Sequence, residues 1–270
     1  MSYVLEAENE FDRLEKQSTY QKYDYRKELE LGGFSPKDGA RILDAGCGSG
    51  VVSRHIATVF PRVSVVGCDA CETRLAQAKR AGASFGNLSF KMQDLSKLEF
   101  SNNYFDWAIV RYVLQHVAAN MRIVALQEIF RCLRPNGKLC IIDFDGPFYN
   151  IYPRTPLVDE VLNKMEAQSP VDLRIGRKLP SLLLKAGFSE VEWCIDTIQC
   201  HGAALNDEKI LIPEKLENAT PFLSEFLGSK SKVEAFKSEY RELLDKPGVV
   251  LFYNKFIVTG SRPGKLNLVK

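Results

Sequence analysis

The chain has 270 residues, of which 45% are hydrophobic and 26% charged, a composition typical of a folded protein with a real core. Its formal net charge is only +2, and Lys and Arg are spread along the chain, so no nucleic-acid-binding face is evident. No stretch approaches the roughly 18 consecutive apolar residues of a transmembrane helix, so we expect no membrane span.

The first segment, MSYVLEAENEFDRLEKQ, is acidic and polar, whereas a secretory signal peptide is basic and then apolar. The seven cysteines are scattered without regular spacing. Because neither an export signal nor a disulfide pattern is evident, we expect a cytoplasmic protein with reduced thiols.

The predicted elements begin with one or two amphipathic helices over residues 5–31, which end at the turn residues GGFSPKDG. Short apolar strands and helices then alternate. The predicted strands are ARILDA, RVSVVGCD, LSFKMQD, YFDWAIVR and KLCIIDFD, and the predicted helices are VVSRHIATVF, CETRLAQAKRAG and ANMRIVALQEIFRCLRPNG. This alternation indicates a parallel sheet that is buried on both faces.

Beyond residue 146 the alternation loosens. We predict a loop at GPFYNIYPRTP, helices over 157–168 and at KLPSLLLKAGF, a sixth strand at SEVEWCIDTIQC, inserted helices over 205–246 and a last strand at VVLFYNKFIVTGSRP. The chain is thereby divided into an N-terminal helical lid (1–35), a core (36–200), a helical insertion (201–248), a final core strand (249–262) and a basic tail (263–270).

A glycine-rich loop, LDAGCGSG, follows the first predicted strand and places Gly46, Gly48 and Gly50 at alternate positions. Glycines this dense indicate a tight turn or backbone that lies close to a bound molecule. A P-loop requires G-x-x-x-x-G-K-[ST], and the dinucleotide fingerprint requires G-x-G-x-x-G. The spacing here is G-x-G-x-G, so both phosphate-binding motifs are excluded.

The loop resembles instead the D-x-G-x-G-x-G motif of class I S-adenosylmethionine-dependent methyltransferases and fits it at every position. YFDWAIVRYVLQHV and CLRPNGKLCIID are similar to segments of small-molecule members such as the ubiquinone and menaquinone biosynthesis methyltransferases. The resemblance covers residues 40 to about 145, and more loosely 10–35 and 170–260. It implies an α/β, Rossmann-like, mostly parallel sheet of seven strands in the order 3-2-1-4-5-7-6, with the last strand antiparallel and helices on both faces.

The resemblance implies S-adenosylmethionine as the cofactor and assigns its contacts. Asp69 ends the second strand, where the family binds the two ribose hydroxyls, and Asp94 ends the third, where the family binds adenine. Taken singly, each acid also fits a helix N-cap, and Gln17 and Tyr23 also fit ordinary helix packing. The full predicted set is Gln17, Tyr23, Asp44, Ala45, Gly46, Gly48, Gly50, Asp69, Ala70, Asp94, Leu95, Arg111 and Tyr112.

Methyl transfer from a sulfonium is an in-line displacement, to which an enzyme contributes mainly by aligning donor and acceptor. Oxygen and carbon acceptors usually also require a base. His116, just after the fourth strand, is predicted as this base and as an acceptor contact, with a loop-anchoring role as the alternative. Asp145 and Tyr149 are further predicted acceptor contacts, and Asp143 is an alternative base.

Aromatic residues in the loop after residue 146 and in the helical insertion favour an apolar or aromatic small-molecule acceptor. Arg174 and Arg177 either hold an acidic substrate or form surface ion pairs. Cys68 and Cys71 form a C-x-x-C without a second such pair, so we expect no metal site. Two alternatives stay open: a protein that binds the cofactor without methyl turnover, and a methyltransferase that acts on a protein or an RNA.

Overall fold

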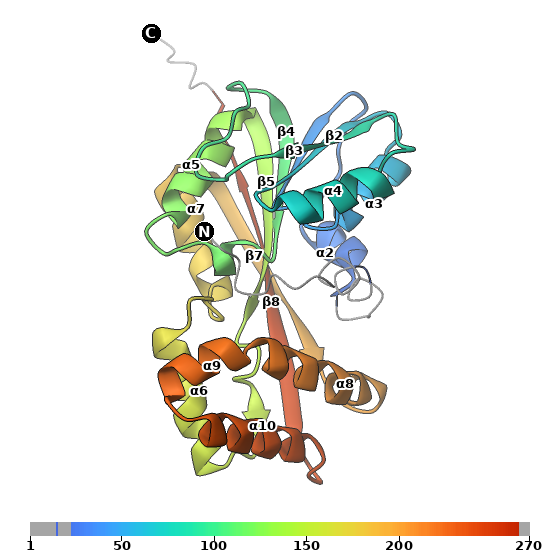
Figure 1. The fold of residues 1–270 in the computed structure, drawn as a ribbon. Helices are drawn as coiled ribbons and strands as arrows, with labels where there is room; N and C mark the ends of the chain where they lie inside the picture. Colours follow the sequence, from blue (N-terminus) through green and yellow to red (C-terminus); the bar gives the residue numbers. More distant parts are fainter. Residues whose placement is uncertain (1–14, 16–22, 265–270) are drawn as a thin grey trace.

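The computed structural model describes residue 15 and residues 23–264. Within these residues the strands form one sheet of order β3-β2-β1-β4-β5-β8-β6, and β7 also pairs with β8 (Figure 1). The strands are β1 (Arg41–Ala45), β2 (Ser64–Asp69), β3 (Leu88–Met92), β4 (Phe105–Arg111), β5 (Leu133–Asp145), β6 (Ile151–Tyr152), β7 (Ser189–Gln199) and β8 (Val250–Ser261).

The predicted strand order is confirmed. The first five strands pair in parallel, and β8 runs antiparallel to both β5 and β7. The sixth and seventh predicted strands correspond to β7 and β8. One strand was not predicted: β6 is only two residues long and pairs with the first residues of β8.

Helices cover both faces of the sheet. Neighbouring residues of a strand point to opposite faces, so a continuously apolar strand needs a helix on each side to bury its side chains. Ile42 packs with α2 (Tyr25–Leu31) and α3 (Val51–Val59), whereas the adjacent Leu43 packs with α5 (Arg122–Cys132) and α7 (Leu179–Ala186). α4 (Glu72–Ala81) covers β3 through Leu75 and Phe90. The central strands β1, β4 and β5 are therefore buried on both faces, as their apolar sequences predict, whereas β3 and β7 keep exposed residues.

A second hydrophobic core lies beyond the carboxyl end of β5 and the amino end of β8. The helices around it form the lower part of the molecule in Figure 1. We call the helices around it the helical layer: α6 (Pro156–Gln168), α8 (Ala203–Asn218), α9 (Thr220–Leu227) and α10 (Lys230–Leu244). Leu162 of α6 is buried in the same core as Ile212 and Phe236. Strand β8 connects the two cores, since its Leu251 lies in the second core and its Val258 in the sheet core.

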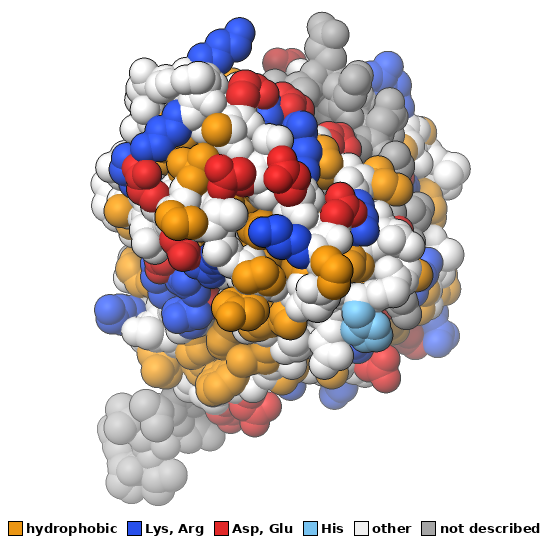
Figure 2. Space-filling model, turned by 90° about the horizontal axis from the view of Figure 1, so that it is seen from below, with side chains coloured by type: hydrophobic (Ala, Val, Ile, Leu, Met, Phe, Trp, Pro, Cys, Tyr) orange, Lys and Arg blue, Asp and Glu red, His pale blue; other side chains and the backbone are white. Residues whose placement is uncertain are grey.

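The outer end of the helical layer is seen in Figure 2, where Lys and Arg side chains are interspersed with Asp and Glu. None of the helices in the described part of the chain has both the length and the apolar character needed to cross a membrane.

Candidate functional site

The glycine loop turns back over the carboxyl ends of β1 and β2. The N–H groups of Gly46 and Cys47 donate to the Cys68 carbonyl oxygen at 2.7 and 2.9 Å. Gly46 and Gly50 have φ of +80° and +78°, a region that other residues rarely adopt. A Cβ at Gly46 would lie 2.4 Å from the Val113 side chain. Conformation and packing therefore both require glycine in this turn.

Asp69, the last residue of β2, lies against this loop. Its Oδ2 accepts the Gly48 N–H at 2.9 Å, and its Oδ1 accepts the Cys71 N–H at 2.8 Å and an Arg74 guanidinium N–H at 3.1 Å. The N-cap of α4 is Cys71, so the alternative role of Asp69 as a helix cap does not apply. The structure thus brings together the loop and the acid that the sequence pairs with it.

Asp44, at the end of β1, is almost fully buried beneath the loop. The Ser53 hydroxyl donates to its Oδ2 at 2.5 Å. Burial raises the pKa of Asp44 to about 6, although the Ser53 hydrogen bond and Arg111 act in the opposite direction. Ala45, which follows it, is also buried, whereas Ala70 beside Asp69 is exposed.

Asp94 lies in the exposed turn after β3. Its Oδ1 accepts both the N–H and the hydroxyl of Ser96, at 2.8 and 2.7 Å, and these hydrogen bonds lower the pKa of Asp94. The neighbouring Leu95 is half-buried and packs against the sheet core.

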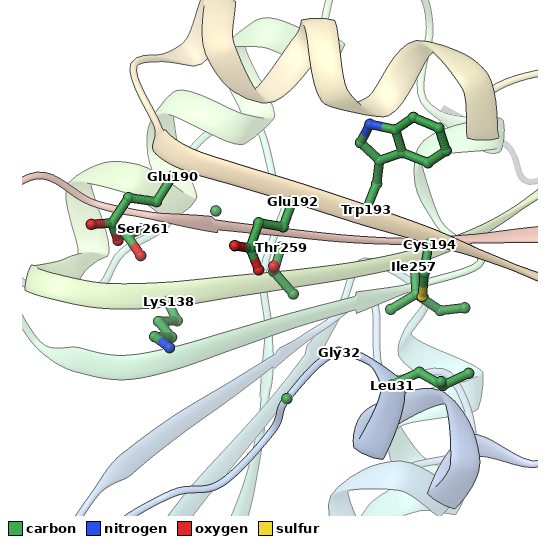
Figure 3. Close-up of a pocket in the computed structure, with 12 residues that line it drawn as sticks. Leu31, Gly32, Lys138, Glu190, Glu192, Trp193, Cys194, Ile257, Thr259 and Ser261 are labelled. Carbon is green, nitrogen blue, oxygen red and sulfur yellow. The ribbon is translucent and has the colours of Figure 1, made fainter.

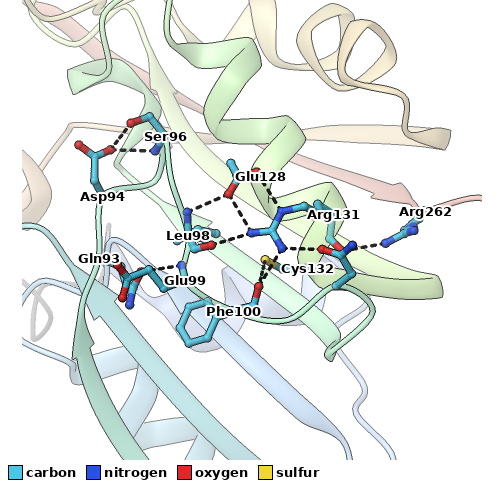
Figure 4. Close-up of polar contacts among 11 residues, drawn as sticks. Gln93, Asp94, Ser96, Leu98, Glu99, Phe100, Glu128, Arg131, Cys132 and Arg262 are labelled. Atoms are coloured by element: carbon cyan, nitrogen blue, oxygen red, sulfur yellow. Dashed lines mark hydrogen bonds and ion pairs between the residues drawn. The ribbon is translucent and has the colours of Figure 1, made fainter.

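Arg131 of α5 fixes the loop that continues from this turn (Figure 4). It donates to the carbonyl oxygens of Leu98 and Phe100 at 2.6 and 2.8 Å. Glu128, which is paired with Arg131, accepts the Leu98 N–H at 2.9 Å. The backbone at Asp94 and Leu95 is therefore continuous with a loop that charged side chains hold in place.

Arg111 and Tyr112, at the end of β4, both contact a buried acid that the sequence did not single out. The Arg111 Nε donates to Glu28 Oε2 at 2.6 Å, and the Tyr112 hydroxyl donates to Glu28 Oε1 at 2.8 Å. Lys255 Nζ donates to the same Oε1 at 2.9 Å and pairs with Asp196 at 2.7 Å. In the sequence Glu28 is one of many charges on an amphipathic helix, so nothing marks it as buried. The signal that could have pointed to a buried acid was Lys255, a charged residue within the apolar strand β8.

Tyr23 lies at the carboxyl edge of β4 and β5. Its backbone carbonyl accepts from Arg111 at 2.9 Å, and its ring meets the rings of Tyr112 and Phe144 edge-on, at centroid distances of 6.0 and 5.8 Å. Gln17, the other predicted lid contact, is outside the described residues.

His116 is half-buried at the end of a 3-10 turn, Leu114–His116. The preceding residue, Gln115, donates its N–H to Asp143 Oδ2 at 3.2 Å, and the Phe144 N–H donates to Oδ1 at 3.0 Å. Burial raises the pKa of Asp143 to about 7. Asp143 thus holds the turn that carries His116.

Asp145 and Tyr149 have different surroundings. Asp145 is buried and paired with Arg177, whose Nε lies 2.8 Å from Oδ2 and whose terminal nitrogen lies 2.5 Å from Oδ1. Tyr149 is buried in the second core, with the Arg174 guanidinium 4.8 Å from its ring centroid. Its hydroxyl has no hydrogen-bond partner within the described part of the chain.

A cavity of about 490 Å³ lies elsewhere, on the sheet face beside the end of α2 (Figure 3). Its lining includes Lys138, Glu192 and Thr259 but none of the residues predicted from the sequence. Lys138 pairs with Trp107 of β4, whereas the pairing of these two strands ends at its carboxyl side with Ile142 opposite Arg111. The cavity therefore lies away from the carboxyl edge of the sheet. We therefore assign the functional site to the edge that carries the glycine loop.

Comparison with known proteins agrees with this geometry. Residues 42–137 match a family model described as a methyltransferase domain. An O-methyltransferase of Pyrenophora dematioidea is 33% identical over 63% of this chain and 61% of its own length. A 2-phytyl-1,4-naphtoquinone methyltransferase of Nostoc sp. is 32% identical over 60% of this chain and 78% of its own length. The chain spans about half to three-fifths of three of its curated relatives, from 47% to 61%.

Among solved structures, phosphoethanolamine N-methyltransferase 2 of Haemonchus contortus has a TM-score of 0.57 and 22% identity. The match covers 88% of this chain and 53% of that one, whose structure contains phosphomonomethylethanolamine and S-adenosylhomocysteine. This likeness shows the fold.

Proposed function

The chain belongs to the class I S-adenosylmethionine-dependent methyltransferases, and we propose that it transfers a methyl group from S-adenosylmethionine to a small-molecule acceptor. The observation that carries the proposal is the 2.9 Å hydrogen bond from the Gly48 N–H to Asp69 Oδ2. It joins the glycine loop to an acid at the carboxyl edge of the sheet, the edge at which open α/β sheets bind their ligands.

The Asp69 carboxylate has capacity left for a ribose. A carboxylate offers about four lone-pair positions, and Gly48, Cys71 and Arg74 use three of them. One ribose hydroxyl can therefore bind Oδ2 directly, and the second can bind when Arg74 turns away. Ala70, exposed next to Asp69, leaves the approach open.

The remaining proposed cofactor contacts lie along the same edge. Asp94 Oδ2 is available to the adenine amine, because both Ser96 hydrogen bonds use Oδ1. The Leu95 N–H makes no hydrogen bond to another described residue, so it can donate to an adenine ring nitrogen. The methionine end is assigned to the backbone of Ala45 through Gly50 and of Arg111 and Tyr112, beside Asp44. Tyr23, together with Gln17, is assigned to the lid.

Bound S-adenosylmethionine supplies an electrophilic methyl group, and the chain supplies alignment and a base. We assign His116 as the base that removes the acceptor's proton. Asp143 positions His116 by holding the turn that carries it. Tyr149 is assigned as an acceptor contact, since its buried hydroxyl lacks a described partner and such a group gains from a ligand hydrogen bond. Asp145 can contact the acceptor only if its pairing with Arg177 is relaxed.

We assign the enzyme to the cytoplasm, and its acceptor to apolar or aromatic small molecules. All seven cysteines are unpaired, which fits a reducing compartment. The aromatic side chains gathered in the second core support the choice of acceptor, and we assign the 201–248 insertion as the pocket and lid.

The test is a methyl-transfer screen with S-adenosylmethionine labelled on its methyl group, over fractionated metabolite extracts. We expect a labelled small molecule with the wild-type protein and none with Asp69→Ala. Asp106→Asn is the matched control, because Asp106 accepts the Arg41 N–H and pairs with Arg134 at the start of β4, on the opposite edge. Tight cofactor binding without any labelled product would contradict the proposal, and label in protein or RNA would contradict the small-molecule acceptor.

A further inference from the structure

Lys215 of α8 directs its ammonium group toward three aromatic rings. Its Nζ lies 5.9 Å from the ring centroid of Tyr23, 6.0 Å from that of Phe148 and 5.8 Å from that of Tyr253. These nearly equal distances are at the outer limit of about 6 Å for a cation–π contact. The ammonium group thus lies among the rings without stacking closely on any one of them.

No carboxylate in the described part of the chain lies within ion-pair distance of Lys215, although its side chain is half-buried. The other enclosed lysines differ. Lys255 pairs with Glu28 and Asp196, and Lys237 pairs with Glu217 and Glu234. Lys215 is therefore a partly enclosed cation without a counter-charge among residue 15 and residues 23–264.

The rings around Lys215 are continuous with the proposed cofactor site. Phe144 stacks on Tyr112 at a centroid distance of 4.4 Å and meets Tyr23 and Tyr253 at 5.8 and 6.4 Å. Tyr112 follows the end of β4, where the methionine part of the cofactor is assigned. An aromatic cluster, made up of Tyr23, Tyr112, Phe144, Phe148 and Tyr253, therefore leads from that end to Lys215.

Helix α8 also fixes one of the rings. The Tyr253 hydroxyl donates to Glu208 Oε2 at 2.6 Å, and both side chains are buried. Glu208 and Lys215 are seven residues apart, two turns along one face of the helix. The same face of α8 thus orients Tyr253 and presents the ammonium group of Lys215.

We propose that Lys215, Tyr23, Phe148 and Tyr253 form the acceptor subsite, and that the acceptor is a planar aromatic molecule with an anionic oxygen, a carboxylate or a phenolate. This inference rests on the proposed function. The rings provide stacking surfaces for an aromatic acceptor. Lys215 provides a positive charge that is weakly screened between them, so it attracts the anionic oxygen and repels a cationic acceptor.

Two probes with the same ring system test the charge: 1-hydroxy-2-naphthoate, which is anionic, and 1-naphthylmethylammonium, which is cationic. Binding is measured by calorimetry with saturating S-adenosylhomocysteine, after its own affinity has been measured for each variant. The wild-type protein should bind the naphthoate at least about tenfold more tightly than the ammonium probe. Lys215→Met should abolish this preference, and Lys215→Arg should retain it.

Lys209→Met is the matched control, because Lys209 lies on the same helix and pairs with Asp245; it should bind both probes as the wild type does. Preference for the cationic probe, or unchanged naphthoate binding by Lys215→Met, would overturn the inference. The inference would also be overturned if the protein bound S-adenosylhomocysteine but neither probe. In that case the proposed cofactor site would still stand. Failure to bind S-adenosylhomocysteine at all would instead refute the proposed function, and the acceptor subsite with it.

Discussion

Lys255 and Glu28 are 227 residues apart in the chain, yet Lys255 Nζ donates to Glu28 Oε1 at 2.9 Å and both side chains are fully enclosed. The same carboxylate accepts from Arg111 and Tyr112. Helix α2, strand β4 and strand β8 are therefore joined at one acid, directly below the edge to which we assign the cofactor.

Replacing this acid should strongly destabilise the fold. Glu28→Gln leaves the charges of Arg111 and Lys255 without their shared partner, and breaking a buried pair in this way costs about 3–5 kcal/mol. Urea unfolding measures the change. Glu30→Gln, an exposed position on the same helix, is the control and should change the free energy of unfolding by less than about 0.5 kcal/mol.

The contribution of Glu28 should also depend on pH. Burial by itself raises the pKa of Glu28, but Arg111 and Lys255 outweigh it and hold the pKa below the usual 4.5. The unfolded chain therefore takes up the proton first, so this stabilisation is complete above pH 4.5 and is lost as the pH falls below it. The difference in unfolding free energy between wild type and Glu28→Gln should shrink from pH 6 to pH 3; an unchanged difference would contradict this assignment.

Asp143 should show the opposite dependence. Burial raises its pKa from the usual 3.8 to about 7, so between these values the folded state holds the proton that the unfolded state has lost. Stability should therefore fall as the pH rises through this window. Relative to wild type, Asp143→Asn should gain about 2 kcal/mol between pH 5 and pH 8 in denaturant titrations. If the wild type instead became more stable relative to Asp143→Asn as the pH rises, Asp143 would be ionised in the folded protein.

The glycine loop can be tested with a pair of matched substitutions. Gly46 and Gly39 have similar φ, +80° and +77°, but a Cβ would lie 2.4 Å from Val113 at the first and meet nothing within 4 Å at the second. Gly39→Ala should cost about 1–2 kcal/mol for the left-handed backbone alone. Gly46→Ala should cost about 1–3 kcal/mol more, from overpacking. Equal losses in thermal or urea unfolding would mean that Val113 moves aside freely.

Asp69 should determine cofactor affinity. Asp69→Asn keeps the shape of the side chain but replaces one acceptor oxygen with a donor, which removes charge-assisted hydrogen bonds of about 1.5–3 kcal/mol. Affinity for S-adenosylhomocysteine, measured by calorimetry, should fall about tenfold to a hundredfold. Full affinity in this variant would show that Asp69 does not bind the cofactor.

The regular part of the molecule could be predicted because each of its elements has a local cause. Apolar strands, helices that end at glycine or proline, and a glycine loop are all visible within short windows of sequence. The pairing of Asp69 with the loop came from the family resemblance, which places an acid at the end of the second strand. The family resemblance added the strand order, which the structure confirms.

The charged and aromatic clusters could not be predicted, because their members are far apart in the chain. Glu28 is separated from Arg111 by 83 residues, and each charge on its own resembles a solvated surface residue. Helix α6 has an ordinary amphipathic pattern that does not show which core it joins; the structure places it with the insertion helices. Strand β6, with two residues, is too short to have a pattern.

Strand β8 follows every one of its sheet partners in the chain, and both β6 and β7 pair with it. Among the described strands, β5 has an open edge and β7 has no partner during synthesis until residues 250–261 have left the ribosome. Neither core can be completed before that moment, so the sheet and the helical layer should reach their native state together, after translation of this strand. A nascent chain stalled before Val250 should therefore remain sensitive to protease over both regions.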